Sequence, residues 1–404
     1  MKCNFDEIIN RRGTNSFKWD KTKEFFGRND ILPMWVADSD WPTAAPIIKA
    51  LKERVEHGAI GYTFPGEELN EIIIEWIKNY YNWEIKKEWI VYTCGVVPSI
   101  NLIIRGFSLP GDEVILQSPV YYPFFQAIRN NGGQIANNQL KWDGRRYVMD
   151  YDDLESIIHR KTNKLRGPSR ARLMILCSPH NPVGRVWEKE ELKKLGQICI
   201  ENDIMVISDE IHADFTFYNN KHNVFASLSE EFANNSITLF APSKTFNIAG
   251  LEGSIAIIPD EKIRNKFNNV CTGIMGSGNA LSLVAMKAAY KCGEEWLKAQ
   301  LNYLENNINY ACDFINNEIK NVQTYKPEGT YLLWMNFKET GFKPEQLNDF
   351  MINKARVALD AGSWFGSGGE NYMRLNLACP RSLLIKGLNR INKALEDELS
   401  GKSV

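Results

Sequence analysis

The 404-residue sequence has no apolar run that approaches the roughly 20 residues a membrane-spanning helix needs. It also lacks an excess of one charge, because 48 Lys and Arg are balanced by 49 Asp and Glu and the formal net charge is −1. The sequence therefore has no excess of positive charge that would favour binding to nucleic acid or to an anionic membrane. We predict that neither is a partner of this protein.

The 8 cysteines are scattered, and the sequence has no Cys-x-x-Cys pair and no Cys/His cluster at zinc spacing. This pattern excludes a disulfide framework and predicts no metal site. The first residues, Met1–Asp6, have no apolar core of the kind found in signal peptides. We expect reduced thiols and a cytoplasmic protein.

Short apolar runs alternate with helical patterns through the middle of the sequence. The strand candidates are Val114–Leu116, Leu173–Cys177, Met205–Ser208, Thr238–Phe240 and Ser254–Ile258. A helical pattern over 188–201 separates the second from the third. This order predicts an α/β protein whose mostly parallel sheet is covered by helices on both faces.

The spacing of apolar residues changes near residue 285. Long helical patterns over 283–317 precede an alternating strand at Tyr331–Asn336. We predict a large domain over 29–285 and a smaller α+β domain formed by 1–28 and 286–404. Ligands of open parallel sheets bind at the carboxyl ends of the strands. Asn181, Asp209 and Lys244 each follow a strand candidate directly.

Ser243-Lys244 and Ser208-Asp209-Glu210 are the most informative motifs. Alone, each is an ordinary surface pair or strand end. Together, a lysine that can form a Schiff base and a carboxylate that can keep a pyridine nitrogen protonated are the two groups that pyridoxal phosphate chemistry requires.

Further motifs accompany this pair in a fixed order. They are Met34–Asp38 (MWVAD), Gly61-Tyr62, Ser118–Pro123 (SPVYYP), Cys177–Gly184 (CSPHNPVG), Asp209–His212 (DEIH), Ser243–Ile248 (SKTFNI) and Tyr372–Asn376 (YMRLN). The series resembles the class I/II branch of the fold-type I aminotransferase superfamily. It is most similar to the MalY/PatB-type cystathionine β-lyases, also called cysteine-S-conjugate β-lyases. The resemblance covers about residues 33–391.

The resemblance implies pyridoxal 5'-phosphate as cofactor and a catalytic role for three residues. Lys244 forms the Schiff base and then serves as general base at Cα. Asp209 binds the pyridine nitrogen, and Tyr121 lies over the ring, with Tyr122 as the competing candidate. Asn181 donates to the phenolic oxygen of the cofactor.

The cofactor phosphate is expected at a helix N-terminus that follows Gly95, where the backbone N–H groups of Val96 and Val97 face the anion. Ser243 adds a hydroxyl. By resemblance, Tyr62 reaches the phosphate across the interface of a homodimer whose active sites are shared between subunits. Many aminotransferases carry a phosphate-binding arginine eight residues after the lysine, but this sequence has Glu252 there.

For the substrate, the resemblance implies that Arg374 grips the α-carboxylate with its bidentate fork, together with Ala37 and Asn181. A structural salt bridge is the alternative role for Arg374. His212 replaces the tyrosine of aspartate-type transaminases. It either supports Asp209 or the cofactor, or is a plain buried histidine.

The implied function is a carbon–sulfur β-lyase that converts cystathionine or other cysteine-S-conjugates, small amino-acid substrates, into a thiol, pyruvate and ammonia. From cystathionine the thiol is homocysteine. An aminotransferase is the alternative, because the same residues serve both reactions. A regulatory binding protein that acts through protein contacts is a third possibility. The basic stretch Arg160–Arg172 is expected to be a solvated loop.

Overall fold

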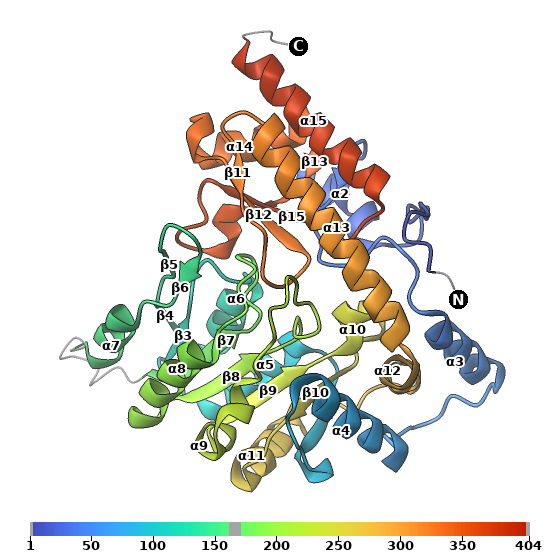
Figure 1. The fold of residues 1–404 in the computed structure, drawn as a ribbon. Helices are drawn as coiled ribbons and strands as arrows, with labels where there is room; N and C mark the ends of the chain where they lie inside the picture. The colour runs from blue at the N-terminus through green and yellow to red at the C-terminus, as the bar shows by residue number, and fades with distance from the viewer. Residues whose placement is uncertain (1–2, 161–170, 401–404) are drawn as a thin grey trace.

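A seven-stranded sheet organises the larger part of the molecule (Figure 1). The computed structural model describes residues 3–160 and 171–400. The strand order is β2-β10-β9-β8-β7-β3-β4, and only β10 runs antiparallel to its neighbours. The strands are β2 (Ile90–Thr93), β3 (Glu113–Leu116), β4 (Gln134–Asn137), β7 (Ala171–Cys177), β8 (Met205–Asp209), β9 (Ser236–Phe240) and β10 (Ser254–Ile257).

Residues of the central strands alternate between two apolar cores, one on each face of the sheet. Leu173 and Ile175 of β7 pack with helices α5, α6 and α11, whereas Met174 and Leu176 pack with α8. Strands buried on both faces are continuous apolar runs, which is why β7 and β8 were recognisable in the sequence. The predicted fold class is therefore confirmed.

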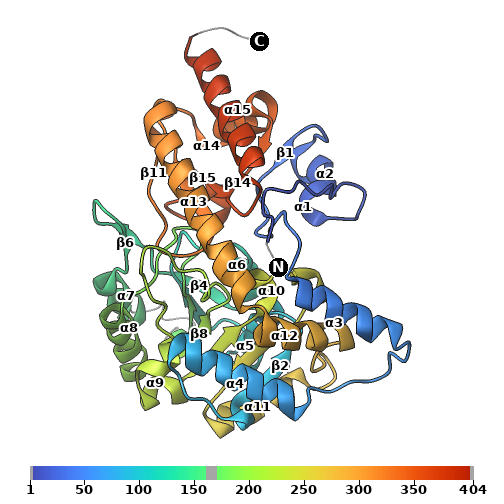
Figure 2. The same cartoon turned by 45° about the vertical axis from the view of Figure 1, so that its right-hand side comes forward.

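A second sheet, of four strands, lies above the first in Figure 1 and has the order β11-β12-β15-β14. Its strands are β11 (Gln323–Thr324), β12 (Leu332–Asn336), β14 (Asp360–Ala361) and β15 (Tyr372–Asn376). The short strand β1 (Leu32–Pro33) pairs with β13 (Val357–Ala358), so the N-terminal segment lies beside the C-terminal region (Figure 2). A hairpin of β5 (Lys141–Trp142) and β6 (Tyr147–Val148) completes the strands.

Fifteen α-helices connect and cover the sheets in the described residues. They are α1 (Phe17–Asp20), α2 (Thr22–Phe26), α3 (Ala45–Glu56), α4 (Glu67–Tyr81), α5 (Val96–Phe107), α6 (Pro123–Asn130), α7 (Tyr151–His159), α8 (Lys189–Glu201), α9 (Glu230–Asn234), α10 (Pro242–Thr245), α11 (Glu261–Cys271), α12 (Ala280–Cys292), α13 (Glu294–Glu318), α14 (Pro344–Phe350) and α15 (Arg381–Leu399). Across the ranges 3–160 and 171–400, none of them combines the length and apolarity needed to cross a membrane.

The helical pattern over 283–317 is split into α12 and α13 at Gly293. A Cβ atom at this glycine would lie 2.2 Å from Cε1 of Phe246, so the close approach of the two chain segments requires glycine there. The five strands predicted for the middle of the chain are present in the large sheet, and the strand predicted at Tyr331–Asn336 is β12. In the large sheet, β2 and β4 were not anticipated. The boundaries of the two predicted domains stay a prediction. Most of the basic stretch, residues 161–170, lies outside the described residues.

Candidate active site

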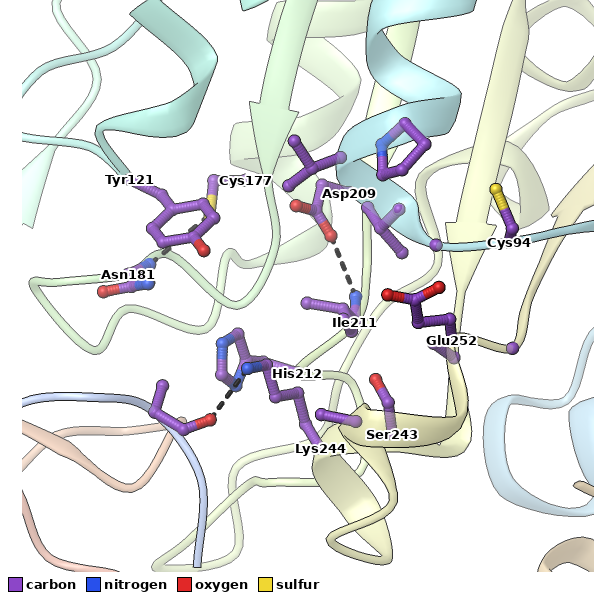
Figure 3. Close-up of a pocket in the computed structure, with 18 residues that line it drawn as sticks. Cys94, Tyr121, Cys177, Asn181, Asp209, Ile211, His212, Ser243, Lys244 and Glu252 are labelled. Carbon is purple, nitrogen blue, oxygen red and sulfur yellow. Dashed lines mark hydrogen bonds between the residues drawn. The ribbon is translucent and has the colours of Figure 1, made fainter. Parts of the chain in front are cut away.

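A cavity of about 250 Å³ opens where β7, β8 and β9 end (Figure 3). These carboxyl ends are the place at which ligands bind to open parallel sheets. The cavity is lined by Ala37, Cys94, Gly95, Val96, Val97, Pro98, Tyr121, Cys177, Asn181, Asp209, Ile211, His212, Ala241, Ser243, Lys244, Ala249, Glu252 and Gly253. Nine of the eleven residues expected in the site belong to this lining, and Arg374 and Tyr62 do not.

Lys244 enters the cavity from α10, a single helical turn that follows β9. Its Nζ donates a hydrogen bond to the carbonyl oxygen of Ala37 at 2.7 Å. Burial lowers the pKa of Lys244 to about 8, and Arg374 acts in the same direction while Asp38 opposes it. A substantial fraction of this amine is therefore neutral near pH 8, as a nucleophile or base requires.

Asp209 is the last residue of β8 and is buried. Its Oδ1 accepts a hydrogen bond from the backbone N–H of Ile211 at 3.1 Å. Burial raises the pKa of Asp209 to about 7, and the adjacent Glu210 raises it further, whereas the Ile211 N–H and Lys244 lower it. No side chain in the described parts of the chain forms a salt bridge with this carboxylate within 4.0 Å. A cation bound in the cavity would stabilise its charged form.

The N-terminus of α5 forms another wall. Gly95 precedes the helix with φ of 140°, a conformation that glycine adopts readily, and a Cβ there would lie 3.2 Å from Pro98. The amides of Val96 and Val97 belong to the first turn of α5, whose N–H groups have no intrahelical acceptor. They line the cavity together with Ser243.

Tyr121, and not Tyr122, lines the cavity, although the two rings lie only 5.4 Å apart. Burial raises the pKa of Tyr121, so its hydroxyl remains protonated. Asn181 is buried on the turn after β7, and its Oδ1 accepts a hydrogen bond from Nη1 of Arg374 at 3.0 Å.

Arg374 on β15 is buried and does not line the cavity, but it contacts Asn181, which does. Its Nη2 donates to the carbonyl oxygen of Trp35 at 3.0 Å and to the carboxylate of Asp360. Arg374 thus forms a structural salt bridge with Asp360, the alternative role given above, and keeps further N–H donors free. Its Nε is also buried, and it has no hydrogen-bond partner among the described residues.

His212 lines the cavity, and its ring packs against Tyr331 and Phe215. Burial lowers the pKa of His212 to about 3, with Lys244 and Arg374 adding to the effect, so the imidazole is neutral at physiological pH. Its Nδ1 has no partner in the described part of the chain, and no hydrogen bond to Asp209 is present there.

Tyr62 lies outside the cavity and is fully exposed. It belongs to the segment 57–66 that joins α3 to α4, on the right-hand side of Figure 2. Ile60 and Phe64 of the same segment are exposed as well, at 57% and 80%.

Several residues of the site were missed in the sequence. Tyr331 donates from its hydroxyl to the Ala37 carbonyl at 3.0 Å, the same acceptor that Lys244 uses. Cys177 and Ile211 line the cavity beside the predicted Asn181 and Asp209, and proximity to those motifs could have indicated them. Asp360 carries no such signal, because only strand pairing brings it to Arg374.

The described residues fit pyridoxal phosphate. The unpaired, buried Asp209 matches a protonated ring nitrogen, and the first amides of α5 with Ser243 match a phosphate. Lys244 and Ser243 lie side by side on the wall of the cavity that faces Asp209 (Figure 3).

The chain matches the model of the family described as aminotransferase class I and II over residues 36–391. It is 44% identical to cystathionine beta-lyase PatB of Bacillus subtilis over 97% of this chain and 100% of that protein. Crystal structures agree. Cystalysin from Treponema denticola, which contains pyridoxal 5'-phosphate, superposes with a TM-score of 0.93 at 37% identity, covering 98% of this chain and 100% of that chain.

The PLP-bound C-S lyase from Staphylococcus hominis has a TM-score of 0.90 at 34% identity, covering 98% of both chains. The fold and the site thus define a member of a known enzyme class. The chain belongs to the aminotransferase class I and II family, and it is similar in particular to its cystathionine β-lyases.

Proposed function

We propose that this protein is a pyridoxal-phosphate-dependent carbon–sulfur β-lyase that acts on cystathionine or other cysteine-S-conjugates. The products are a thiol, pyruvate and ammonia. The similarity over nearly the full length to a cystathionine β-lyase and to a C-S lyase supports this substrate class. The observation that carries the proposal is the placement of Lys244 and Asp209 in one cavity at the ends of β8 and β9.

When bound, pyridoxal phosphate supplies an aldehyde that links to amines and a ring that withdraws electrons from Cα. Asp209 stabilises a proton on the ring nitrogen by its negative charge. Asn181 and Tyr121 orient the ring, and the amides of Val96 and Val97 with Ser243 hold the phosphate.

Lys244 moves the proton in the reaction. Its amine, with a pKa lowered to about 8 by burial, holds the cofactor at rest and takes the Cα proton once the substrate amine replaces it. Arg374 binds the α-carboxylate through the donors that its protein partners leave free, and Ala37 and Asn181 border the same space. The thiolate leaves from Cβ and takes up a proton to become the thiol. The remaining three-carbon fragment is released as 2-aminoacrylate, which one water molecule hydrolyses to pyruvate and ammonia.

The site is chemically able to transfer amino groups as well, so the test must separate the two outcomes. The purified holoenzyme is incubated with cystathionine, and thiol and pyruvate are followed with and without an added keto acid. A β-lyase releases both products steadily without keto acid. A strict keto-acid requirement would identify an aminotransferase and overturn the proposal.

We infer further that the protein works as a homodimer in which Tyr62 of each subunit reaches the phosphate of the other. Glu252 lines the cavity at the position where many relatives have a phosphate-binding arginine, so the phosphate has no guanidinium from this wall. Ile60, Tyr62 and Phe64 expose a large apolar area on one segment, as interface residues do in an isolated subunit. Light scattering at working concentration tests the assembly, and a monomer would contradict it.

A further inference from the structure

Asp360 is a buried carboxylate to which neither the motifs nor the proposed reaction assign a role. It lies on β14 directly opposite Arg374 on β15, as a cross-strand pair of the smaller sheet. Both side chains are nearly inaccessible, at 1% and 2% exposure. The strand register therefore fixes the carboxylate against the guanidinium.

The guanidinium has five N–H donors. Three of them are used by Asn181, by the Trp35 carbonyl and by Oδ2 of Asp360. The remaining donors, including the buried Nε, are those available to a ligand. Oδ1 of Asp360 has no partner among the described residues.

We propose that Asp360 is a positioning and affinity-setting residue for the substrate α-carboxylate, acting through Arg374. Its oxygen orients the planar fork so that the free N–H groups face the substrate. Its charge neutralises the guanidinium before the substrate arrives, and it limits how tightly a second carboxylate is held. The inference rests on the proposed use of Arg374 for an amino-acid substrate.

The two effects have opposite signs. A carboxylate that shares one guanidinium with Asp360 is repelled by it, which weakens binding in a buried site of low dielectric. The Asp360 oxygen that accepts from Nη2, together with the Trp35 carbonyl, fixes the orientation of the guanidinium, which strengthens binding. Asparagine at position 360 removes the charge and keeps an acceptor, whereas alanine removes both.

The experiment compares two ligands on the holoenzyme. L-Norleucine carries the α-carboxylate, and pentylamine is the same molecule without it. Dissociation constants come from the change in cofactor absorbance on titration. We expect Asp360→Asn to bind norleucine about three- to tenfold more tightly than the wild type. Asp360→Ala should bind it about tenfold more weakly than Asp360→Asn. Pentylamine should bind all three proteins alike.

Glu328→Gln is the matched control, because Glu328 forms another ion pair with a buried arginine, Arg185, at 2.8 Å. It should leave the ratio of the two dissociation constants unchanged. The inference fails if Asp360→Asn binds norleucine no better than the wild type, if the two variants are equal, or if pentylamine changes in parallel. A wild type that binds pentylamine as well as norleucine would refute the carboxylate role of Arg374 and with it this inference, whereas the β-lyase activity is tested separately by product release without keto acid.

A wild-type measurement covers the case in which a variant does not fold. Burial raises the pKa of Asp360 to about 6 although Arg374 opposes this. Tyr121 and Tyr122 also interact with Asp360, but burial raises their pKa values and they stay protonated. The dissociation constant of norleucine should therefore fall relative to that of pentylamine as the pH falls through about 6, because Asp360 loses its charge. A constant ratio would contradict the charge effect.

Discussion

The two sheets place their functional groups in contrasting surroundings. At the end of the large sheet, the side chains of Asp209 and Lys244 each form one hydrogen bond, to a backbone group. On the small sheet, Arg374 is bound to Asn181, Trp35 and Asp360 at once. Groups that exchange protons or bonds are left with few partners, while the group that recognises a fixed anion is oriented by several.

Replacing Lys244 should have the largest effect, because no other lysine lines the cavity within the described residues. We expect Lys244→Ala to lower kcat by about 10⁴-fold or more. Steady-state release of pyruvate measures it. Lys193→Ala, which removes an exposed lysine of α8, should behave as the wild type. Comparable losses in both variants would show that Lys244 has no special role.

Asp209→Ala should lower kcat by about 10³-fold and weaken cofactor binding far less, because the charge is needed most when the Cα carbanion forms. Turnover and cofactor dissociation are measured on the same preparations. Small and equal effects on both would mean that Asp209 is structural.

The same carboxylate should cost stability in the cofactor-free protein. Its folded-state pKa of about 7 exceeds the ordinary 3.8, so the folded state retains a proton that the unfolded chain releases. The stability present at low pH is therefore lost as pH rises from about 4 to about 7, by at most about 4 kcal/mol. In urea unfolding, Asp209→Asn should remove this part of the pH dependence. An unchanged pH profile would contradict the raised pKa.

Arg374→Lys should lower kcat/KM by about 10- to 100-fold, because an ammonium cannot reproduce the fork. The effect should vanish for ligands without an α-carboxylate. Arg185→Lys changes another buried, multiply paired arginine and should reduce stability without this selectivity. Equal losses for both kinds of ligand would assign Arg374 to folding alone.

Tyr62→Ala should have the smallest effect of the series, about a tenfold loss in cofactor affinity from one missing hydrogen bond. Co-folding it with Lys244→Ala makes about half the dimers hybrid, and one site of each hybrid then carries neither lesion. At a cofactor concentration that leaves the Tyr62→Ala sites largely empty, this variant is badly impaired, and about a quarter of the wild-type activity should reappear in the mixture. Activity no higher than the mean of the separate variants would show that Tyr62 serves the site of its own subunit or only packs against other residues.

The large sheet and the site residues at its edge could be predicted because short stretches of sequence specify both. Buried parallel strands are apolar runs, and the motifs at Asn181, Asp209 and Lys244 follow them directly. β4 has the sequence QIAN, with polar residues at both ends, and gave no such run. β2 contains the apolar run Ile90–Tyr92 and could have been recognised from it. Gly293, which splits α12 from α13, acts through a contact with Phe246 that no local pattern reveals.

The small-sheet side was less predictable for the same reason. Arg374 was found by its motif, but its pairing with Asp360 depends on strand register across 14 residues. The hydroxyl of Tyr331 reaches the Ala37 carbonyl across 294 residues. Contacts of this kind arise from tertiary packing, and a single sequence carries no periodic signal for them.

We propose that the cavity at the large sheet holds its cofactor covalently on Lys244. Borohydride reduction of the holoenzyme fixes a cofactor bound to an amine, and mass spectrometry of the digested protein then locates it. We expect reduced pyridoxal phosphate on the peptide that contains Lys244, in the wild type and in Arg374→Lys alike. Reduced cofactor on a different lysine, or none at all in an active enzyme, would contradict it.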